Sequence, residues 1–339
     1  MLGYIRRELE RLGFDTLVTC REYEYTVGSL RRLGIDPIVI GRYVEGGSIE
    51  KVLADVERMK ALIDLVSKWD PDVLIAYPNP PASRVAFGLG IKYVALTDSP
   101  HAVIPSRLSL PLADYVVYPS AIPEFEISKY VTRGMTKLVP YDGVDEVTWV
   151  VRSRPNLKYL ESLGLKPCEY VIIRPHEYLA TYYKGVRVRI DLEKLISEIY
   201  THGLTPLVLP RYSRHLDLIT KLRSLGVDVR VINGGYDGVS LTYYALAVVT
   251  GGASMAREAA LLGTLGLTYY PHDLYVNTYL IKKGFPLVKV GDTDEVLNYV
   301  LSSDRVSECR CKRFDEVLNK VRSNFDDPAK VVIDVLRSV

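Results

Sequence analysis

The chain has no apolar run long enough to span a bilayer, so a membrane-spanning protein is not expected. Its first segment, MLGYIRRELERLGF, carries too much charge for a secretory signal peptide. Neither sign of charge dominates, because the net charge is +2 over 339 residues, and nothing in this balance indicates a nucleic-acid partner. These absences predict a cytoplasmic protein without a transmembrane segment.

Cysteine is also scarce, with four residues in the chain. Cys20 and Cys168 stand alone in the sequence, whereas Cys309 and Cys311 form a C-x-C pair. A zinc site needs a second pair of ligands at suitable spacing, and the sequence offers none. We therefore expect thiols without a function in a reducing compartment, and no bound metal.

The length and the pattern of apolar residues predict two α/β domains. A chain of 339 residues exceeds what one compact core usually holds. Strand-like apolar runs alternate with amphipathic stretches, and the alternation breaks around Trp149 to Pro167 before it restarts. The prediction is two halves, each a parallel sheet flanked by helices, over residues 1–150 and 151–325, followed by a helix within 326–339.

The first half begins inside what is predicted to be a helix. Domains of this kind normally open with a strand and a glycine-rich loop before that helix. Either the true start lies upstream of Met1, or the domain lacks its central strand. The first interpretation is favoured, because the loss of a central strand would expose the edges of its two neighbours.

The segment VVTGGASMAREAALLGT, residues 248–264, is the strongest functional signal. Gly251 and Gly252 allow a sharp turn after a strand and leave room for a ligand near the backbone. The N–H groups at the start of the next helix, with the hydroxyl of Ser254, form an anion site. Glu258, one turn further on, suits the two vicinal hydroxyls of a ribose. The alternative is that Glu258 only stabilises the N-terminus of its own helix.

Two further loops follow strands of the same half. Arg174 stands at the carboxyl end of the first strand, where open α/β sheets bind ligands, and an arginine there can neutralise a diphosphate. His176 and Lys184 follow on the same loop. Tyr236 and Asp237, on the loop of residues 233–244, are candidates to flank a nucleotide base.

The chain resembles the GT-B clan, which includes MurG-like glycosyltransferases and UDP-N-acetylglucosamine 2-epimerases, and most narrowly an uncharacterised archaeal family of that clan. The similar segments cover nearly the whole chain: VTCREYEYTVGSLRRLGID, RVAFGLGI, TDSPHA, LPLADYVVYP, VIIRPHEYLATYYKG, YDGVSLTYYALAVVTGGASMAREAALLGT and YLIKKG. The resemblance implies two Rossmann-like domains facing a cleft, a C-terminal helix that crosses back to the first domain, and a Glu258 that holds the nucleotide ribose. It also implies metal-independent chemistry on a nucleotide sugar, with no further cofactor.

The resemblance places the second substrate or the catalytic group in the first half. Asp98 and His101 lie near a strand end, and either is a candidate general base for an acceptor hydroxyl. The alternatives are that Asp98 caps a turn and that His101 packs in a proline-bounded turn. In the clan, the loop of residues 269–280 faces the donor sugar, which makes His272 and Asp273 candidate sugar contacts.

Two loops depart from the epimerase pattern. The epimerases carry Gly-Asp-Thr where this chain has Pro78-Asn79-Pro80, so a carboxylate is missing, and the run Arg174-Pro175-His176-Glu177 only partly matches their His-Arg-Arg-Glu-Asn. We therefore expect a glycosyltransferase that uses a nucleotide-sugar donor, UDP-linked, and an acceptor such as a glycan or a lipid-linked sugar. The alternatives are an epimerase-like enzyme and an inactive nucleotide-sugar-binding protein, and a homodimer is left open.

Overall fold

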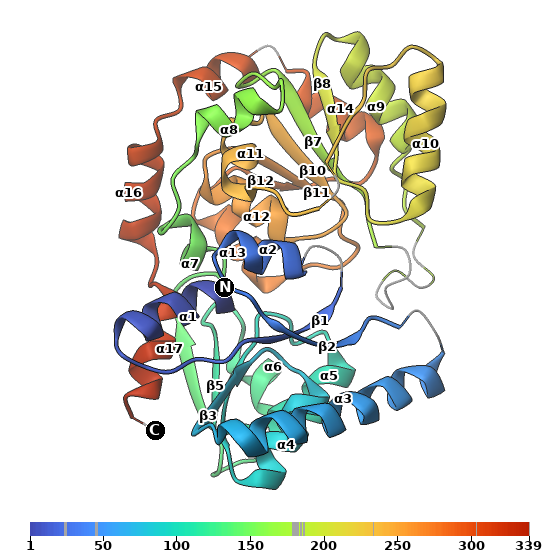
Figure 1. Cartoon of the computed structure of the whole chain (residues 1–339). Coiled ribbons are helices and arrows are strands. Elements are labelled where there is room, and N and C mark those ends of the chain that lie inside the picture. The colour runs from blue at the N-terminus through green and yellow to red at the C-terminus, as the bar shows by residue number, and fades with distance from the viewer. Residues whose placement is uncertain are drawn as a thin grey trace. The chain divides into compact units, whose positions relative to one another are not determined.

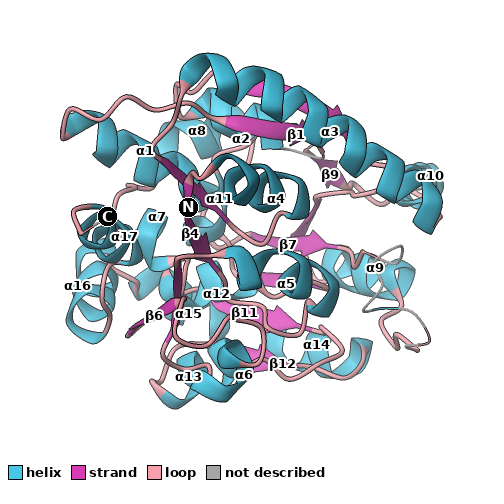
Figure 2. Ribbon diagram, turned by 90° about the horizontal axis from the view of Figure 1, so that it is seen from below, coloured by secondary structure: helices cyan, strands magenta, loops and turns pink. Residues whose placement is uncertain are grey.

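The computed structural model describes residues 1–23, 26–44, 47–177, 183, 185, 187–232, 234–302 and 304–338. The chain forms two compact units, in each of which helices and strands alternate (Figure 1, Figure 2). The first unit comprises Met1–Thr148 and Phe325–Val339, and the second comprises Trp149–Asn324. No helix in the described part of the chain has the length and apolar composition that a membrane crossing requires.

The strands of the first unit form two parallel sheets, one with the order β1-β2 and one with the order β3-β4-β5-β6. Their bounds are β1 Thr19–Glu22, β2 Ile38–Arg42, β3 Val73–Ala76, β4 Lys92–Leu96, β5 Tyr115–Pro119 and β6 Lys137–Tyr141. Among the described strands β1 and β3 do not pair, so this half differs from the single sheet that its alternation predicts.

Helices pack against the two sheets of the first unit. Their bounds are α1 Leu2–Arg11, α2 Thr26–Arg32, α3 Ser48–Trp69, α4 Pro80–Leu89, α5 Val103–Ser109, η1 Leu110–Leu112, α6 Glu124–Ser128 and α17 Pro328–Leu336. Helices α1 and α17 pack side by side (Figure 1), and their buried residues Ile5 and Val332 join Val94 and Val117 of the sheet in one core. The last helix of the chain thus belongs to the same core as the first.

The second unit contains a six-stranded parallel sheet with the order β12-β11-β10-β7-β8-β9. The bounds are β7 Tyr170–Arg174, β8 Thr205–Val208, β9 Arg230–Val231, β10 Ala247–Thr250, β11 Leu265–Thr268 and β12 Leu287–Lys289. The chain proceeds from β7 outward in one direction through β8 and β9, and then returns to β10 on the other side of β7. This reversal creates a topological switch point between β7 and β10, where open α/β sheets bind ligands.

Helices pack on both faces of this sheet, and successive side chains of β7 point alternately to the two faces. Val171 and Ile173 join a core that includes α9 and α10, whereas Tyr170 and Ile172 join a core that includes α8 and α11. The helices of this unit are α8 Leu157–Ser162, α9 Leu192–Thr201, α10 Ser213–Ser224, α11 Gly238–Tyr244, α12 Ser254–Leu261, α13 Tyr275–Lys282, α14 Thr293–Val300, α15 Arg305–Cys311 and α16 Phe314–Asn324, and the short α7 Val147–Val150 precedes them.

The cysteines differ from the expectation that all four are unpaired thiols. Cys168, just before β7, forms a disulfide with Cys309 of α15, which is 141 residues away in sequence. Cys20 is buried and Cys311 is exposed, and both are free. The C-x-C spacing did not predict this pairing. Cys168 becomes the partner of Cys309 because α15 packs near the start of β7 in the folded chain.

Candidate functional site

Three of the predicted binding residues meet at the switch point of the second unit. Arg174 ends β7, and its carbonyl accepts the N–H of Gly251, which follows β10, at 3.1 Å. His176 passes directly over this glycine, because a Cβ built on Gly251 would lie 2.2 Å from His176 Cβ and 2.4 Å from its Cα. Gly251 is therefore required for the close approach of two chain segments, and His176 fills the room that the sequence assigned to a ligand.

Gly252 leaves more space than Gly251. A Cβ built on it would meet its nearest neighbours, Thr250 Oγ1 and Arg211 Nη2, at 3.6 Å, an ordinary contact distance. The N–H of Gly252 donates to Thr250 Oγ1 at 2.9 Å, and its carbonyl accepts the hydroxyl of Thr268 at 2.8 Å. The backbone at this turn is thus held in one conformation while its Cα stays accessible.

Helix α12 begins immediately after this turn, at Ser254. Its N-cap is Ala253, which has no side-chain acceptor for the first-turn N–H groups. Ser254 is exposed, and its hydroxyl accepts from Arg257 Nη2 at 3.3 Å. The amino end of α12 therefore has no side-chain cap, which is the arrangement expected of an anion site, and the anion site itself stays a prediction.

Glu258 lies one turn into α12, and its carboxylate already has two donors. Trp149 Nε1 donates to Oε2 at 2.6 Å, and the Thr242 hydroxyl donates to Oε1 at 3.1 Å. Burial raises the pKa of Glu258, whereas these two hydrogen bonds lower it. Two carboxylate oxygens offer about four acceptor positions, so the group retains capacity for a ligand hydroxyl.

Tyr236 approaches the same carboxylate across Gly238. A Cβ built on Gly238 would lie 3.3 Å from Glu258 Oε1 and 3.7 Å from Tyr236 Cε2. Asp237 is the N-cap of α11, and it accepts the N–H of Ser240 at 3.1 Å and the Ser240 hydroxyl at 2.5 Å. The fold thus brings Tyr236 to Glu258, while the carboxylate of Asp237 serves the helix that follows it.

The remaining predicted residues of the second unit are two exposed side chains, one buried arginine and one lysine outside the described residues. His272 and Asp273 are both exposed, and Asp273 pairs with Lys289 of β12 at 2.6 Å. Arg174 is buried, with 8% of its surface exposed. Lys184 lies outside the described residues.

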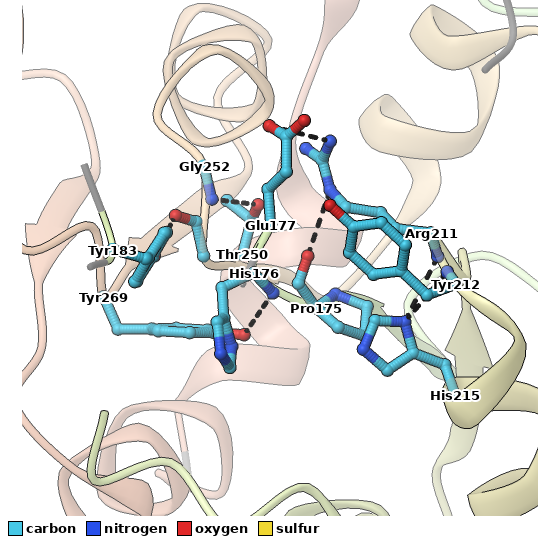
Figure 3. Close-up of polar contacts among 11 residues, drawn as sticks. Pro175, His176, Glu177, Tyr183, Arg211, Tyr212, His215, Thr250, Gly252 and Tyr269 are labelled. Carbon is cyan, nitrogen blue, oxygen red and sulfur yellow. Dashed lines mark hydrogen bonds and ion pairs between the residues drawn. The ribbon is translucent and has the colours of Figure 1, made fainter. Parts of the chain in front are cut away.

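Polar and aromatic side chains surround the predicted residue His176, and among them Arg211 was not predicted from the sequence (Figure 3). Tyr269 OH accepts the backbone N–H of His176 at 3.1 Å, and Tyr183 OH donates to the carbonyl of Gly251. Arg211, three residues beyond the end of β8, extends toward Glu177. The rule that selected Arg174, a cation at the carboxyl end of a strand, applies equally to the segment TPLVLPR and would have found Arg211.

In the first unit, Asp98 and His101 follow β4. Asp98 is half-buried, and its Oδ1 accepts the Ser99 hydroxyl at 2.7 Å. His101 is exposed. This hydrogen bond to the adjacent residue is compatible with the turn alternative and with the catalytic one, so the role of Asp98 stays a prediction.

Asp145, which the sequence did not single out, lies in a buried acidic group of the first unit. It is 6% exposed, and its carboxyl accepts the hydroxyls of Tyr77 and Tyr141. Burial, followed by the charges of Asp98 and Glu146, raises the pKa of Asp145 to about 7, although the two tyrosine hydrogen bonds act in the opposite direction. A carboxyl group with a pKa near neutrality thus lies next to the carboxyl ends of β3 and β6.

This raised pKa predicts a pH-dependent stability. The folded protein retains the proton on Asp145 up to about pH 7, whereas the unfolded chain releases it near the ordinary value of 3.8. The folded state therefore binds more protons between these values, so the free energy of unfolding falls as the pH rises from about 4 to about 7. We expect D145N, measured by urea unfolding across this window, to reduce the total fall in the free energy of unfolding between about pH 4 and about pH 7 by at least about 1 kcal/mol.

The matched control for this prediction is D36N, since Asp36 is a carboxylate of the same unit whose side chain is 88% exposed. D36N is expected to keep the wild-type slope. Equal slopes for wild type and D145N would show that Asp145 does not carry the shifted pKa.

Within the described ranges no three His, Cys, Asp or Glu side chains converge as the ligands of a metal ion would.

A sequence model of the family described as "Protein of unknown function (DUF354)" matches residues 3–337. The chain belongs to the DUF354 family. The DUF354 chain is also 28% identical over 307 residues to the uncharacterized protein MJ0665 of Methanocaldococcus jannaschii, a match that covers 87% of this chain and 85% of the relative.

Solved structures with the same fold include UDP-GlcNAc 2-epimerases. The enzyme from Neisseria meningitidis, bound to UDP-GlcNAc, superposes with a TM-score of 0.69 at 14% identity over 100% of this chain and 96% of that chain. The enzyme from Methanocaldococcus jannaschii, in complex with UDP-GlcNAc and UDP, gives a TM-score of 0.66 at 14% identity with the same coverage, 100% and 96%. At these identities the likeness establishes the fold of the DUF354 chain: the GT-B-like architecture predicted from the sequence is confirmed.

Proposed function

We propose that this DUF354 protein binds a UDP-linked sugar through its second unit and transfers the sugar to an acceptor. The observation that carries the proposal is the arrangement around α12. A glycine turn and a helix N-terminus without a side-chain cap lie at the switch point, and a carboxylate with Tyr236 beside it lies one turn further along. This order matches the phosphates, ribose and base of a nucleotide.

The structures with the same fold support this proposal, since those proteins were solved with UDP-GlcNAc or UDP. In the proposed reaction the departing diphosphate is stabilised by the amino end of α12 and by cationic side chains such as Arg174. Asp98, with His101 as the alternative, is proposed to take the proton of the acceptor hydroxyl. His272 and Asp273 remain proposed contacts of the donor sugar, and Lys184 of its phosphates.

An epimerase-like activity is the second candidate, and the names of the structural relatives favour it. Epimerisation requires groups that remove a sugar proton and return it on the other face. The loop after β3 places Asn79 at the N-cap of α4, where its side chain accepts the N–H of Ala82 at 3.4 Å. An amide at this position cannot act as the base that a carboxylate provides, and this favours transfer over epimerisation.

The binding part of the proposal is tested with tryptophan fluorescence. The chain has two tryptophans, Trp69 and Trp149, so W69F leaves only the indole that donates to Glu258. Titration of W69F protein with UDP is expected to change the emission of Trp149 saturably, because ribose hydroxyls at Glu258 alter its hydrogen bonds. Calorimetry on the wild-type protein runs in parallel, and no heat together with no fluorescence change would refute nucleotide binding.

The reaction itself is tested by product analysis with UDP-GlcNAc in D2O. UDP release that depends on an added acceptor extract indicates transfer. Deuterium incorporation at C2 of the sugar, without UDP release, indicates epimerisation. A protein that binds UDP and shows neither result is a nucleotide-sugar-binding protein.

A further inference from the structure

An ion pair stands beside the glycine turn of the second unit. Arg211 Nη1 lies 3.6 Å from Glu177 Oε2, and the two side chains are 13% and 18% exposed (Figure 3). The separation exceeds that of a hydrogen-bonded pair, so the contact is a charge attraction without the bidentate geometry that arginine forms with an oxyanion. The two opposite charges thus lie next to each other in a largely buried position.

The position of Arg211 is fixed by its own chain and by α10. Its Nε donates to the carbonyl of Pro175 at 3.1 Å. The backbone N–H groups of Arg211 and Tyr212 point to His215 Nδ1 at 3.2 and 3.4 Å, and His215 is 4% exposed. The guanidinium is thus held at the end of β8 by contacts that do not involve Glu177.

The guanidinium reaches the start of the anion site. A Cβ built on Gly252 would lie 3.6 Å from Arg211 Nη2, so the cation lies over the Cα of the second turn glycine, two residues before α12 begins. A planar fork of N–H donors therefore lies beside the glycine turn that leads into the amino end of α12. Two neighbouring sources of positive potential suit an anion with more than one charged group.

We propose that Arg211 binds the diphosphate of the ligand and that Glu177 is the counter-charge that this diphosphate replaces. The inference rests on the proposed nucleotide-sugar function and adds a named phosphate ligand to it. In the free protein Glu177 neutralises the guanidinium; in the complex, two phosphate oxygens take the fork of Arg211 and Glu177 moves away from the incoming charge. Glu177 thereby weakens the binding of any anion that cannot replace it at the guanidinium of Arg211.

The experiment measures binding of inorganic pyrophosphate and of UDP by calorimetry. We expect E177Q to bind pyrophosphate at least about fivefold more tightly than wild type, because the competing carboxylate is removed. We expect R211Q to bind it at least about tenfold more weakly, since a charge-assisted contact is lost. R211K keeps the positive charge but lacks the planar fork, so its affinity for pyrophosphate is expected to lie between those of R211Q and wild type. R211K replaces R211Q in the test if R211Q does not fold.

The matched controls come from the ion pair of Glu193 and Lys221, which join α9 and α10 of the same unit at 2.8 Å on an exposed surface. E193Q and K221Q make the same changes of net charge and are expected to bind pyrophosphate as wild type does.

If UDP binds the wild-type protein and E177Q binds neither ligand more tightly, the exchange is refuted while the proposed function stands. If E177Q strengthens pyrophosphate binding and UDP does not bind, the anion site stands and the nucleotide proposal fails. Absence of pyrophosphate binding in wild type and E177Q alike overturns the inference.

Discussion

Gly251→Ala is expected to lower the free energy of unfolding by roughly 3 kcal/mol or more. The added Cβ would lie 2.2 Å from His176 Cβ, 2.4 Å from its Cα and 2.8 Å from its N. Two of these three atoms belong to the backbone, so no rotation of a side chain relieves the overlap. Relief requires separation of the loop after β7 from the turn after β10, and this breaks the hydrogen bond between Gly251 N–H and Arg174 O.

The neighbouring substitution Gly252→Ala is the control, since it makes the same chemical change one residue away. Its Cβ would meet Thr250 Oγ1 and Arg211 Nη2 at 3.6 Å, and neither glycine has a left-handed φ. We expect G252A to change stability by less than about 0.5 kcal/mol in urea unfolding. Equal stability of G251A and G252A would contradict the close approach at the switch point.

This pair of glycines illustrates what the sequence could predict. The segment TGGAS predicts a turn between a strand and a helix, and the structure confirms the turn between β10 and α12. The sequence assigned one purpose, ligand access, to both glycines. Their different surroundings depend on His176, which is 75 residues away along the chain and reaches the turn only because β7 and β10 are neighbours in the sheet.

The same limit explains what the sequence analysis missed. Periodicity and turn residues are local signals, and they predicted the alternation of strands and helices that both units show. The disulfide of Cys168 and Cys309, and the hydrogen bond from Tyr77 to Asp145, join residues that are distant in sequence. Their pairing follows from sheet order and helix packing, which a single sequence does not encode in any local pattern.

Arg211 shows a second kind of omission. It stands at a strand end in the segment TPLVLPR, as Arg174 does in CEYVIIRP, and both positions were open to the same argument. Both side chains are largely buried, and the contacts of Arg211 are what distinguish it. Arg174 is 8% exposed within the last position of β7, whereas the guanidinium of Arg211 extends over Gly252. Position along a strand selects candidates, and the contact of Arg211 with Gly252 can be known only from the structure.

Glu258→Ala is expected to weaken UDP binding on the order of 100-fold. A carboxylate that accepts hydrogen bonds from both ribose hydroxyls contributes about 3 kcal/mol through two charge-assisted contacts. The substitution also removes the acceptor of Trp149 Nε1 and of the Thr242 hydroxyl, and this costs stability independently of any ligand. Glu258→Gln separates the two effects, because the amide keeps one oxygen acceptor and nearly the same shape. We expect E258Q to unfold close to wild type and to bind UDP on the order of tenfold more weakly.

Three ligands distinguish a ribose contact from a structural role of Glu258. Wild-type protein is expected to prefer UDP over 2′-deoxy-UDP, because the latter lacks one of the two hydroxyls, and E258A is expected to lose this preference. Pyrophosphate, which has no ribose, is expected to bind E258A and wild type equally, since its contacts lie at the turn and the start of α12. Loss of pyrophosphate binding in E258A would mean that the carboxylate supports the local structure. Unchanged affinity of E258A for UDP would refute the ribose assignment, because the hydrogen bonds of Trp149 and Thr242 would then be the only purpose of this buried acid.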